Sequence, residues 1–203
     1  MIILKKGAMF GLDARIALAI FGSLSLISGA ALYSAITESK ATKTLAQFKE
    51  IAKAWDQYIL DTGSYLPRSS SNDASSAYRE IRIKELVTDN GVAGWDGPYI
   101  NIEPHPAGSW QSLICPQTTG NDCLINMAEH APGTSNNCRK YMSVCDIWIV
   151  KSIYFSSNKD LDMNEVNILD MKLDGGDGAS SGDLQWSGSD IKYRVTTLKA
   201  AAF

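Results

Sequence analysis

Histidine is scarce in this chain, and recognisable catalytic motifs are absent. Only His105 and His130 occur in 203 residues. The sequence holds no nucleophile elbow, no His-Glu-x-x-His and no Gly-rich phosphate loop, which are the signatures of common hydrolases, zinc proteases and nucleotide-binding enzymes. His105 stands between two prolines in a predicted loop, and His130 lies inside a cysteine-bounded region. We therefore expect a protein that is not an enzyme.

An excess of positive charge is also absent. The chain has 19 basic and 22 acidic residues, with a formal net charge of −3, and its basic residues are scattered. Removal of an N-terminal leader carrying Lys5 and Lys6 takes away two positive charges and leaves −5. A general nucleic-acid surface needs clustered Lys and Arg, so none is expected here.

The four cysteines lack the closely spaced C-x2-C pairs of zinc sites. Cys115, Cys123, Cys138 and Cys145 all fall within 31 residues of one another. Disulfides persist in oxidising compartments, so this usage predicts an exported domain with all four cysteines oxidised. Four cysteines allow three connectivities. Local pairing (115 with 123, 138 with 145) would close two small loops, whereas nested pairing would join the strands expected around residues 114 and 146.

Charge is missing from one long segment near the N-terminus. Residues 16–36 are 21 consecutive uncharged and mostly apolar residues. As a helix they would extend about 31 Å, close to the thickness of a bilayer core. Lys5 and Lys6 precede this segment, so the positive-inside rule predicts a cytoplasmic N-terminus and an exported remainder.

Proline and glycine are both absent from residues 30–61, so a helix can continue beyond the membrane surface. Apolar residues there recur at spacings of three and four, which predicts a helix with one face to bury. They are Leu45, Phe48, Ile51, Ala52, Trp55, Tyr58 and Ile59. Gly63 stands where the C-cap of this helix is expected, and Pro67 prevents the helix from resuming. We expect one helix of about fifty residues.

The later sequence predicts a sheet with two shorter helices. Residues 109–114, 146–155 and 192–198 are rich in strand-forming side chains, and residues 78–87 read as a short amphipathic helix. Asp162 is placed to cap a helix from Met163 to about Leu173, with Gly175 beyond its end. The expected fold class is α+β, with a long helix packed on an antiparallel sheet and a disulfide-bounded loop region.

The N-terminus combines a basic leader with an unusual acid. Lys5 and Lys6 are followed by the small residues Gly7 and Ala8, and Asp13 stands just before the apolar segment, where an ordinary signal peptide has no use for an acid. These residues resemble those of the type IV prepilins, in which a basic leader ends in a small residue and an acid is the fifth mature residue. Cleavage between Ala8 and Met9 gives Asp13 that place, whereas cleavage between Gly7 and Ala8 moves it to sixth.

Three further segments are similar to type IV pilins and to the pseudopilins of type II secretion. Gly63-Ser64-Tyr65-Leu66-Pro67 resembles their turn after the long helix, and Gly97-Pro98-Tyr99 resembles their entry to the sheet. The segment from Met163 to Trp186 is similar to the late helix, Asp-Gly turn and strand of pilin-like heads. Such heads often carry a disulfide-bounded variable region.

The resemblance implies an architecture, a function and partners. The leader would be 1–8, the membrane and assembly helix 9–37 and the head 38–203. The chain would be cleaved and methylated by prepilin peptidase, delivered by an inner-membrane assembly platform, and built into a helical fibre as a pilus subunit for adhesion, motility, DNA uptake or a similar task. In the family the acid pairs with the N-terminal amine of a neighbouring subunit, here Asp13 with Met9. The alternatives are a pseudopilin of a type II secretion system and a membrane-anchored periplasmic binding domain.

Aspartates cluster late in the chain, at Asp170, Asp174, Asp177 and Asp183. Carboxylate oxygens are the ligands that calcium prefers, although neither this set nor Asp160, Asp162 and Asn164 completes an EF-hand loop. The preferred interpretation is a polar surface turn without a cofactor. Calcium is the alternative, and some pseudopilin heads bind it.

Overall fold

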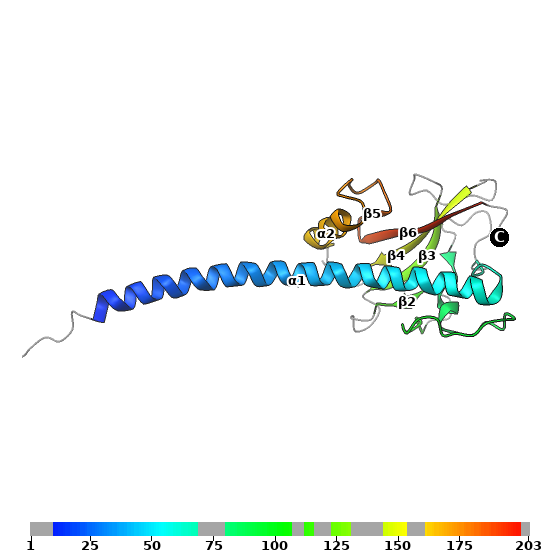
Figure 1. Cartoon of the computed structure of the whole chain (residues 1–203), viewed down its shortest axis with the longest axis horizontal. Coiled ribbons are helices and arrows are strands. Elements are labelled where there is room, and N and C mark those ends of the chain that lie inside the picture. The colour runs from blue at the N-terminus through cyan, green and yellow to red at the C-terminus, as the bar shows by residue number, and fades with distance from the viewer. Residues whose placement is uncertain are drawn as a thin grey trace, which may run out of the picture. The chain divides into compact units, whose positions relative to one another are not determined.

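The described part of the chain contains one long helix, a second short helix and an antiparallel sheet (Figure 1). The computed structural model describes residues 10–68, 80–106, 112–115, 123–130, 144–153 and 161–199. Two compact units are distinguished, Met1–Lys40 and Ala41–Phe203. The predicted α+β class is confirmed at this level.

Helix α1 covers Phe10–Thr62, 53 residues, in agreement with the predicted length. Its end is also as predicted. Gly63 has a positive φ of 64°, and its N–H donates to the carbonyl of Ile59 at 2.9 Å. The Thr62 hydroxyl donates to the Tyr58 carbonyl at 2.7 Å, so side chain and glycine together satisfy the last turn.

The sheet has the strand order β1-β3-β4-β6-β5, with β2 also paired to β3, and every pairing is antiparallel. The strands are β1 (Glu80–Ile81), β2 (Leu113–Ile114), β3 (Leu124–His130), β4 (Val144–Ser152), β5 (Leu184–Ser187) and β6 (Asp190–Lys199). Strands β4 and β6 contain residues 146–152 and 192–198 of the predicted strands. Of the segment predicted at 109–114, Leu113 and Ile114 form β2, and residues 109–111 lie outside the described part.

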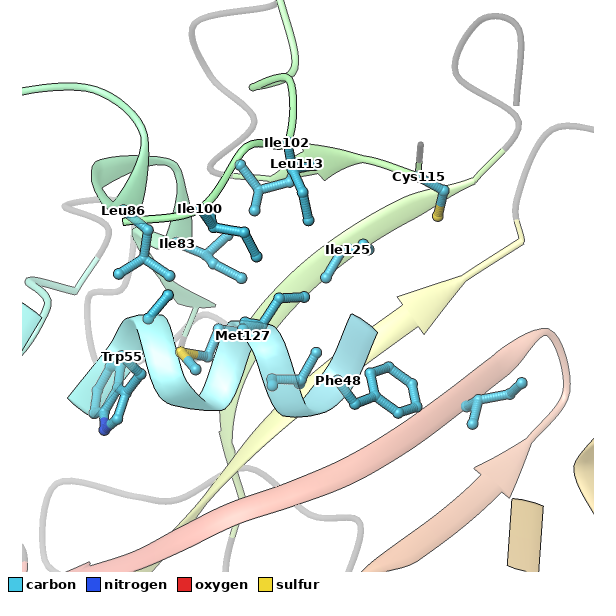
Figure 2. Packing of buried hydrophobic residues seen from close by; sticks show 14 of the residues in the cluster. Phe48, Trp55, Ile83, Leu86, Ile100, Ile102, Leu113, Cys115, Ile125 and Met127 are labelled. Atoms are coloured by element: carbon cyan, nitrogen blue, oxygen red, sulfur yellow. The ribbon is translucent and has the colours of Figure 1, made fainter. Parts of the chain in front are cut away.

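The core of the second unit forms where α1 meets the sheet. Phe48, Ile51, Trp55 and Tyr58 are all at most 1% exposed, as their spacing predicts. Figure 2 shows Phe48 and Trp55 among buried side chains from β3 and from the segment between β1 and β2. Burial of this apolar stripe, at about 25 cal/mol per Å², stabilises the packing of α1 on the sheet.

Helix α2 (Met163–Leu173) begins and ends as predicted. The Asp162 side chain accepts a hydrogen bond from the Asn164 N–H at 3.1 Å, which is the geometry of an N-cap. Beyond the helix, Gly175 has a φ of 73°. The Asp162 carboxylate and the Asn164 backbone N–H are therefore used in capping. Asp160, the third residue of the predicted oxygen pattern, lies outside the described residues.

One prediction about local structure is wrong. Within the helix predicted at 78–87, Glu80–Ile81 form strand β1 and Ile83–Leu86 form a 3₁₀ helix, whereas residues 78–79 lie outside the described part. Ile81 pairs with Met127 of β3, and this long-range pairing overrides the local helical pattern. The cysteine region, expected to be loop-rich, also contains a strand that the sequence did not predict, the seven-residue β3, which gains hydrogen-bonding partners on both sides. Residues 116–122 and 131–143 of that region lie outside the described part.

Candidate functional site

The first candidate site is an apolar surface on α1. Large apolar side chains of residues 16–36 are between 46% and 77% exposed: Ile16, Leu18, Ile20, Phe21, Leu24, Leu26, Ile27, Leu32, Tyr33 and Ile36. By length and composition this helix is apolar enough to cross a membrane, and none of its most apolar stretch is buried within the chain. An exposed apolar area of this extent marks contact with lipid or with another protein.

Asp13 lies in the first turn of α1 and is exposed. A carboxylate there is favoured by the positive end of the helix dipole. The predicted cleavage residues Gly7, Ala8 and Met9 lie outside the described part of the chain, so the predicted pairing of Met9 with Asp13 stays a prediction.

The second candidate site is an acidic cluster at the C-terminal end of α2. Asp170, Asp174 and Asp177 each offer a carboxylate oxygen, and these oxygens all lie within 4.8 Å of one another. Asp183 does not belong to this group. Its Oδ1 accepts from the Arg194 Nε at 2.7 Å instead.

The carboxylates of the acidic cluster are only partly satisfied. Asp174 Oδ2 accepts from the Leu184 N–H at 2.6 Å, and Asp170 Oδ2 accepts from the Gly178 N–H at 3.2 Å. Asp170 is 5% exposed, and its Oδ1 is buried without a hydrogen-bond partner among the described residues. A buried carboxylate oxygen without a partner costs free energy, which a bound cation would recover.

Two further features make negative charge unfavourable in the acidic cluster. Loss of solvation, followed by the charges of Asp174 and Asp170, raises the pKa of Asp177, although its side chain is exposed. The cluster also lies at the negative end of the α2 dipole. Divalent cations with oxygen ligands, calcium above all, fit this donor set.

Gly182 lets the chain pass close to the acidic cluster. Its φ is +70°, and a Cβ built there would lie 2.5 Å from Asp174 Oδ2 and 2.6 Å from Asp177 Oδ2. Any other residue would collide with the two carboxylates and would be strained in this conformation. Nothing in the sequence singles out this glycine among its neighbours.

The cysteines that the structure describes are oxidised. Cys115 and Cys123 form a disulfide with a Cα–Cα distance of 5.4 Å, so local pairing is confirmed for this pair. Cys145 is also disulfide-bonded, and Cys138 lies outside the described residues. Oxidised sulfurs do not serve as thiolate ligands.

Both histidines are buried in packed surroundings. His130 is on β3, 4% exposed, with its ring edge-on to Trp148 at 6.3 Å between centroids. His105 is 7% exposed, and its backbone N–H donates to the Ser112 carbonyl at 2.9 Å. Burial therefore separates both imidazole rings from bulk solvent in the part of the chain that the structure describes.

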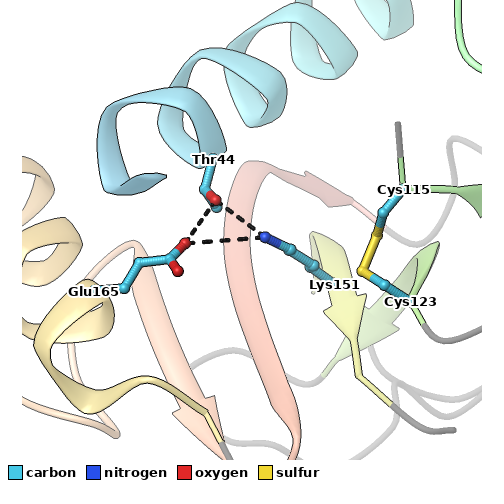
Figure 3. The surroundings of a disulfide bond; sticks show 5 residues. All are labelled: Thr44, Cys115, Cys123, Lys151 and Glu165. Carbon is cyan, nitrogen blue, oxygen red and sulfur yellow. Dashed lines mark hydrogen bonds and ion pairs between the residues drawn. A yellow bond between two sulfur atoms is a disulfide. The ribbon is translucent and has the colours of Figure 1, made fainter. Parts of the chain in front are cut away.

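A polar network that the sequence did not reveal joins α1, β4 and α2 (Figure 3). The Thr44 hydroxyl donates to Glu165 Oε1 at 2.8 Å, and Lys151 Nζ donates to Thr44 Oγ1 at 3.0 Å. Lys151 Nζ lies 4.0 Å from Glu165 Oε1. Burial lowers the pKa of Lys151, and the charge of Glu165 partly opposes that shift. The only sequence signal is a lysine near the end of an apolar strand.

Comparison with known proteins returns no match to this chain: no family model, no curated protein and no solved structure is significantly similar to it.

Proposed function

We propose that this protein is a structural subunit, not an enzyme, that is held in a membrane by the apolar surface of α1 and assembles with copies of itself through that helix. The class is that of the type IV pilins. The unassembled subunit lies in a bacterial inner membrane with a cytoplasmic N-terminus and a periplasmic head, and the assembled fibre is extracellular.

The observation that carries this proposal is the exposed apolar surface on an uninterrupted helix. The same helix is apolar on all sides over residues 16–36 and buries one stripe, from Phe48 to Tyr58, in the second unit. A simple tether does not need the helix to continue into the folded unit. Helices packed side by side in a fibre would cover the exposed surface that the chain itself leaves open.

Asp13 provides the test of assembly. In a lone subunit an exposed acid at the membrane boundary stays hydrated, and its removal changes little. In a fibre it is drawn among apolar helices, where it needs a cation such as the amine of Met9 in a neighbouring subunit. That pairing would also select the axial register between subunits.

The experiment replaces Asp13 in cells that make the protein. Asp13→Asn keeps the shape and removes the charge, and we expect normal expression, membrane insertion and leader cleavage but strongly reduced sheared fibres. Asp13→Glu is the matched control and should retain fibres. Normal fibre yield with Asp13→Asn would refute the register argument.

Two alternatives use the same apolar helix. A pseudopilin of a type II secretion system would form a short periplasmic assembly, so Asp13→Asn would reduce secretion of the exported substrates without changing surface fibres. A membrane-anchored periplasmic binding domain would remain monomeric in the membrane. In vivo cysteine crosslinking between neighbouring helices, with one cysteine at Ser25, would give a crosslinked dimer for either assembly and none for the anchored domain.

A second function, cation binding by the head, is favoured by the buried unpartnered oxygen of Asp170. Calcium at about 100 times its dissociation constant stabilises a protein by roughly 2.7 kcal/mol, which corresponds to about 5–10 °C in Tm for a domain of this size. We expect that increase in the wild type and its loss in Asp174→Asn. Asp183→Asn removes one charge outside the cluster and should keep the increase. An unchanged wild-type Tm in calcium would contradict the cation site and leave the acidic cluster as a polar surface turn.

A further inference from the structure

Helix α2 contributes Asp170 to the acidic cluster and also contacts α1. Its last turn contains Asp170, and its first turn contains Glu165, which bonds Thr44 of α1. Near its end Lys172 Nζ donates to the Thr42 hydroxyl at 3.1 Å. We call Thr42 and Thr44 of α1, together with Lys172 and Glu165 of α2, the α2 seat.

The helix between the two features is short and anchored. It has 11 residues, and Val166 and Leu169 are completely buried in the core. An α-helix of three turns moves as a unit, so a change in position or order at Asp170 reaches Glu165 and Lys172. Asp174, the C-cap of the same helix, is itself a member of the acidic cluster.

One half of the seat belongs to a largely buried polar network. Thr44 is 4% exposed and stands between Lys151 and Glu165, both largely covered, whereas Thr42 and Lys172 are exposed. Displacement of α2 would leave these groups short of hydrogen bonds in a poorly solvated place, which is costly. Because Asp170 and Glu165 belong to the same helix, an ion that fixes Asp170 would also favour the well-bonded arrangement of Thr44.

We propose that calcium binding at Asp170, Asp174 and Asp177 strengthens the seating of α2 on Thr42 and Thr44, at the start of the second unit. This rests on the proposed cation site and adds its regulatory consequence: the head would grip its own part of α1 more firmly when calcium is bound. By linkage, the effect is reciprocal, so weakening the seat lowers calcium affinity by the same factor.

The test uses neutral substitutions, because a changed charge would alter calcium affinity by Coulomb attraction alone. Thr44→Val and Thr42→Val remove the seat hydroxyls without changing net charge. Calcium titration calorimetry on the full chain in detergent micelles should give a dissociation constant about 5-fold or more higher for Thr44→Val, the lower range of typical coupling. Thr44→Ser restores the hydroxyl and should restore affinity.

Thr62→Val is the matched control, because that hydroxyl bonds the Tyr58 carbonyl at the other end of the helix. It should bind calcium as the wild type does. Hydrogen exchange gives an independent readout: in the wild type, calcium should slow exchange at residues 42–48 as well as at 163–184. In Thr44→Val, protection should be confined to the residues around the acidic cluster.

The outcomes separate the two ideas. Calcium binding with unchanged affinity in Thr44→Val, and no protection at residues 42–48, would overturn the coupling and keep the cation site. Absence of calcium binding in the wild type would overturn both.

Discussion

The side chain of Glu85 is buried, with 2% of its residue surface exposed. Arg82 Nε lies 2.8 Å from its Oε1, and the Asn90 amide donates to its Oε2. Asn90 also donates to the Tyr58 hydroxyl at 3.1 Å, so Glu85 helps to hold the segment after the 3₁₀ helix against α1. Burial raises the pKa of Glu85 above its ordinary value, and the bond from Asn90 and the charge of Arg82 oppose this only partly.

This shift predicts a pH-dependent penalty. A carboxyl whose pKa is raised on folding favours the folded state below its unfolded pKa and loses that contribution as pH rises through the folded value. Glu85→Gln should therefore raise Tm at pH 7, and the difference from wild type should shrink below about pH 4.3. Thermal unfolding of the full chain in detergent at both pH values measures it.

Glu103→Gln is the control, since Glu103 is exposed. Its Tm should follow that of the wild type at both pH values. A lower Tm for Glu85→Gln at pH 7 would mean that the Arg82 ion pair outweighs the burial of the charge.

The connection between α2 and β5 depends on a close approach of backbone to carboxylates. Gly182 and Gly188 both have positive φ, 70° and 60°. A Cβ added at Gly182 would meet Asp174 and Asp177, whereas one added at Gly188 would have no described atom within 4 Å. Gly182→Ala should therefore cost more than Gly188→Ala, which carries backbone strain of roughly 1 kcal/mol alone.

Two measurements check this pair. Chemical unfolding should show the larger loss of stability for Gly182→Ala, and calcium titration should show weakened binding in that variant only. Equal losses in the two variants would mean that the loop moves away from the carboxylates without cost.

The Cys115–Cys123 disulfide joins the end of β2 to the start of β3. It lies next to the registered pair Ile114 and Leu124, so it supports a very short strand. Loss of a native disulfide from a small secreted domain costs roughly 2–5 kcal/mol, and Cys123→Ser should lower head stability within that range.

Chemical unfolding of oxidised wild type and Cys123→Ser measures the difference. The double variant Cys115→Ser/Cys123→Ser is the control, because it excludes effects of the remaining thiol. Similar stability of all three would show that the strand pairing alone supports this edge.

At the scale of the whole molecule, the two compact units, Met1–Lys40 and Ala41–Phe203, differ in what covers their apolar side chains. The second unit has its own core, whereas the apolar residues 16–36 of the first are exposed to whatever surrounds the chain. Membrane or fibre must therefore cover the first unit in the assembled protein that we propose.

Processing should leave this apolar segment in the mature protein. We expect intact-mass analysis to show loss of residues 1–8, addition of one methyl group and retention of residues 16–36. Loss of residues 1–7 instead would show the alternative cleavage between Gly7 and Ala8. A mature N-terminus near Ala31 would point to an ordinary signal peptide and would contradict the pilin proposal.

The sequence by itself determined the elements whose signals are local. The uncharged run, the absence of Pro and Gly over 30–61 and the cap at Gly63 specify α1, and Asp162 with Gly175 specifies α2, because periodicity and capping act within a few residues. Proximity in the chain also predicted a group of four aspartates, of which the structure brings together Asp170, Asp174 and Asp177 and leaves Asp183 out.

Tertiary structure decided the features that depend on distant partners. Strand β3 forms in a region that read as loop because its neighbours β2 and β4 supply the hydrogen bonds, and Ile81 joins a strand rather than a helix for the same reason. Asp183 is separated from the other aspartates by Arg194, and Thr44 meets Glu165 across 121 positions of sequence. Such contacts depend on long-range packing, which no local pattern encodes.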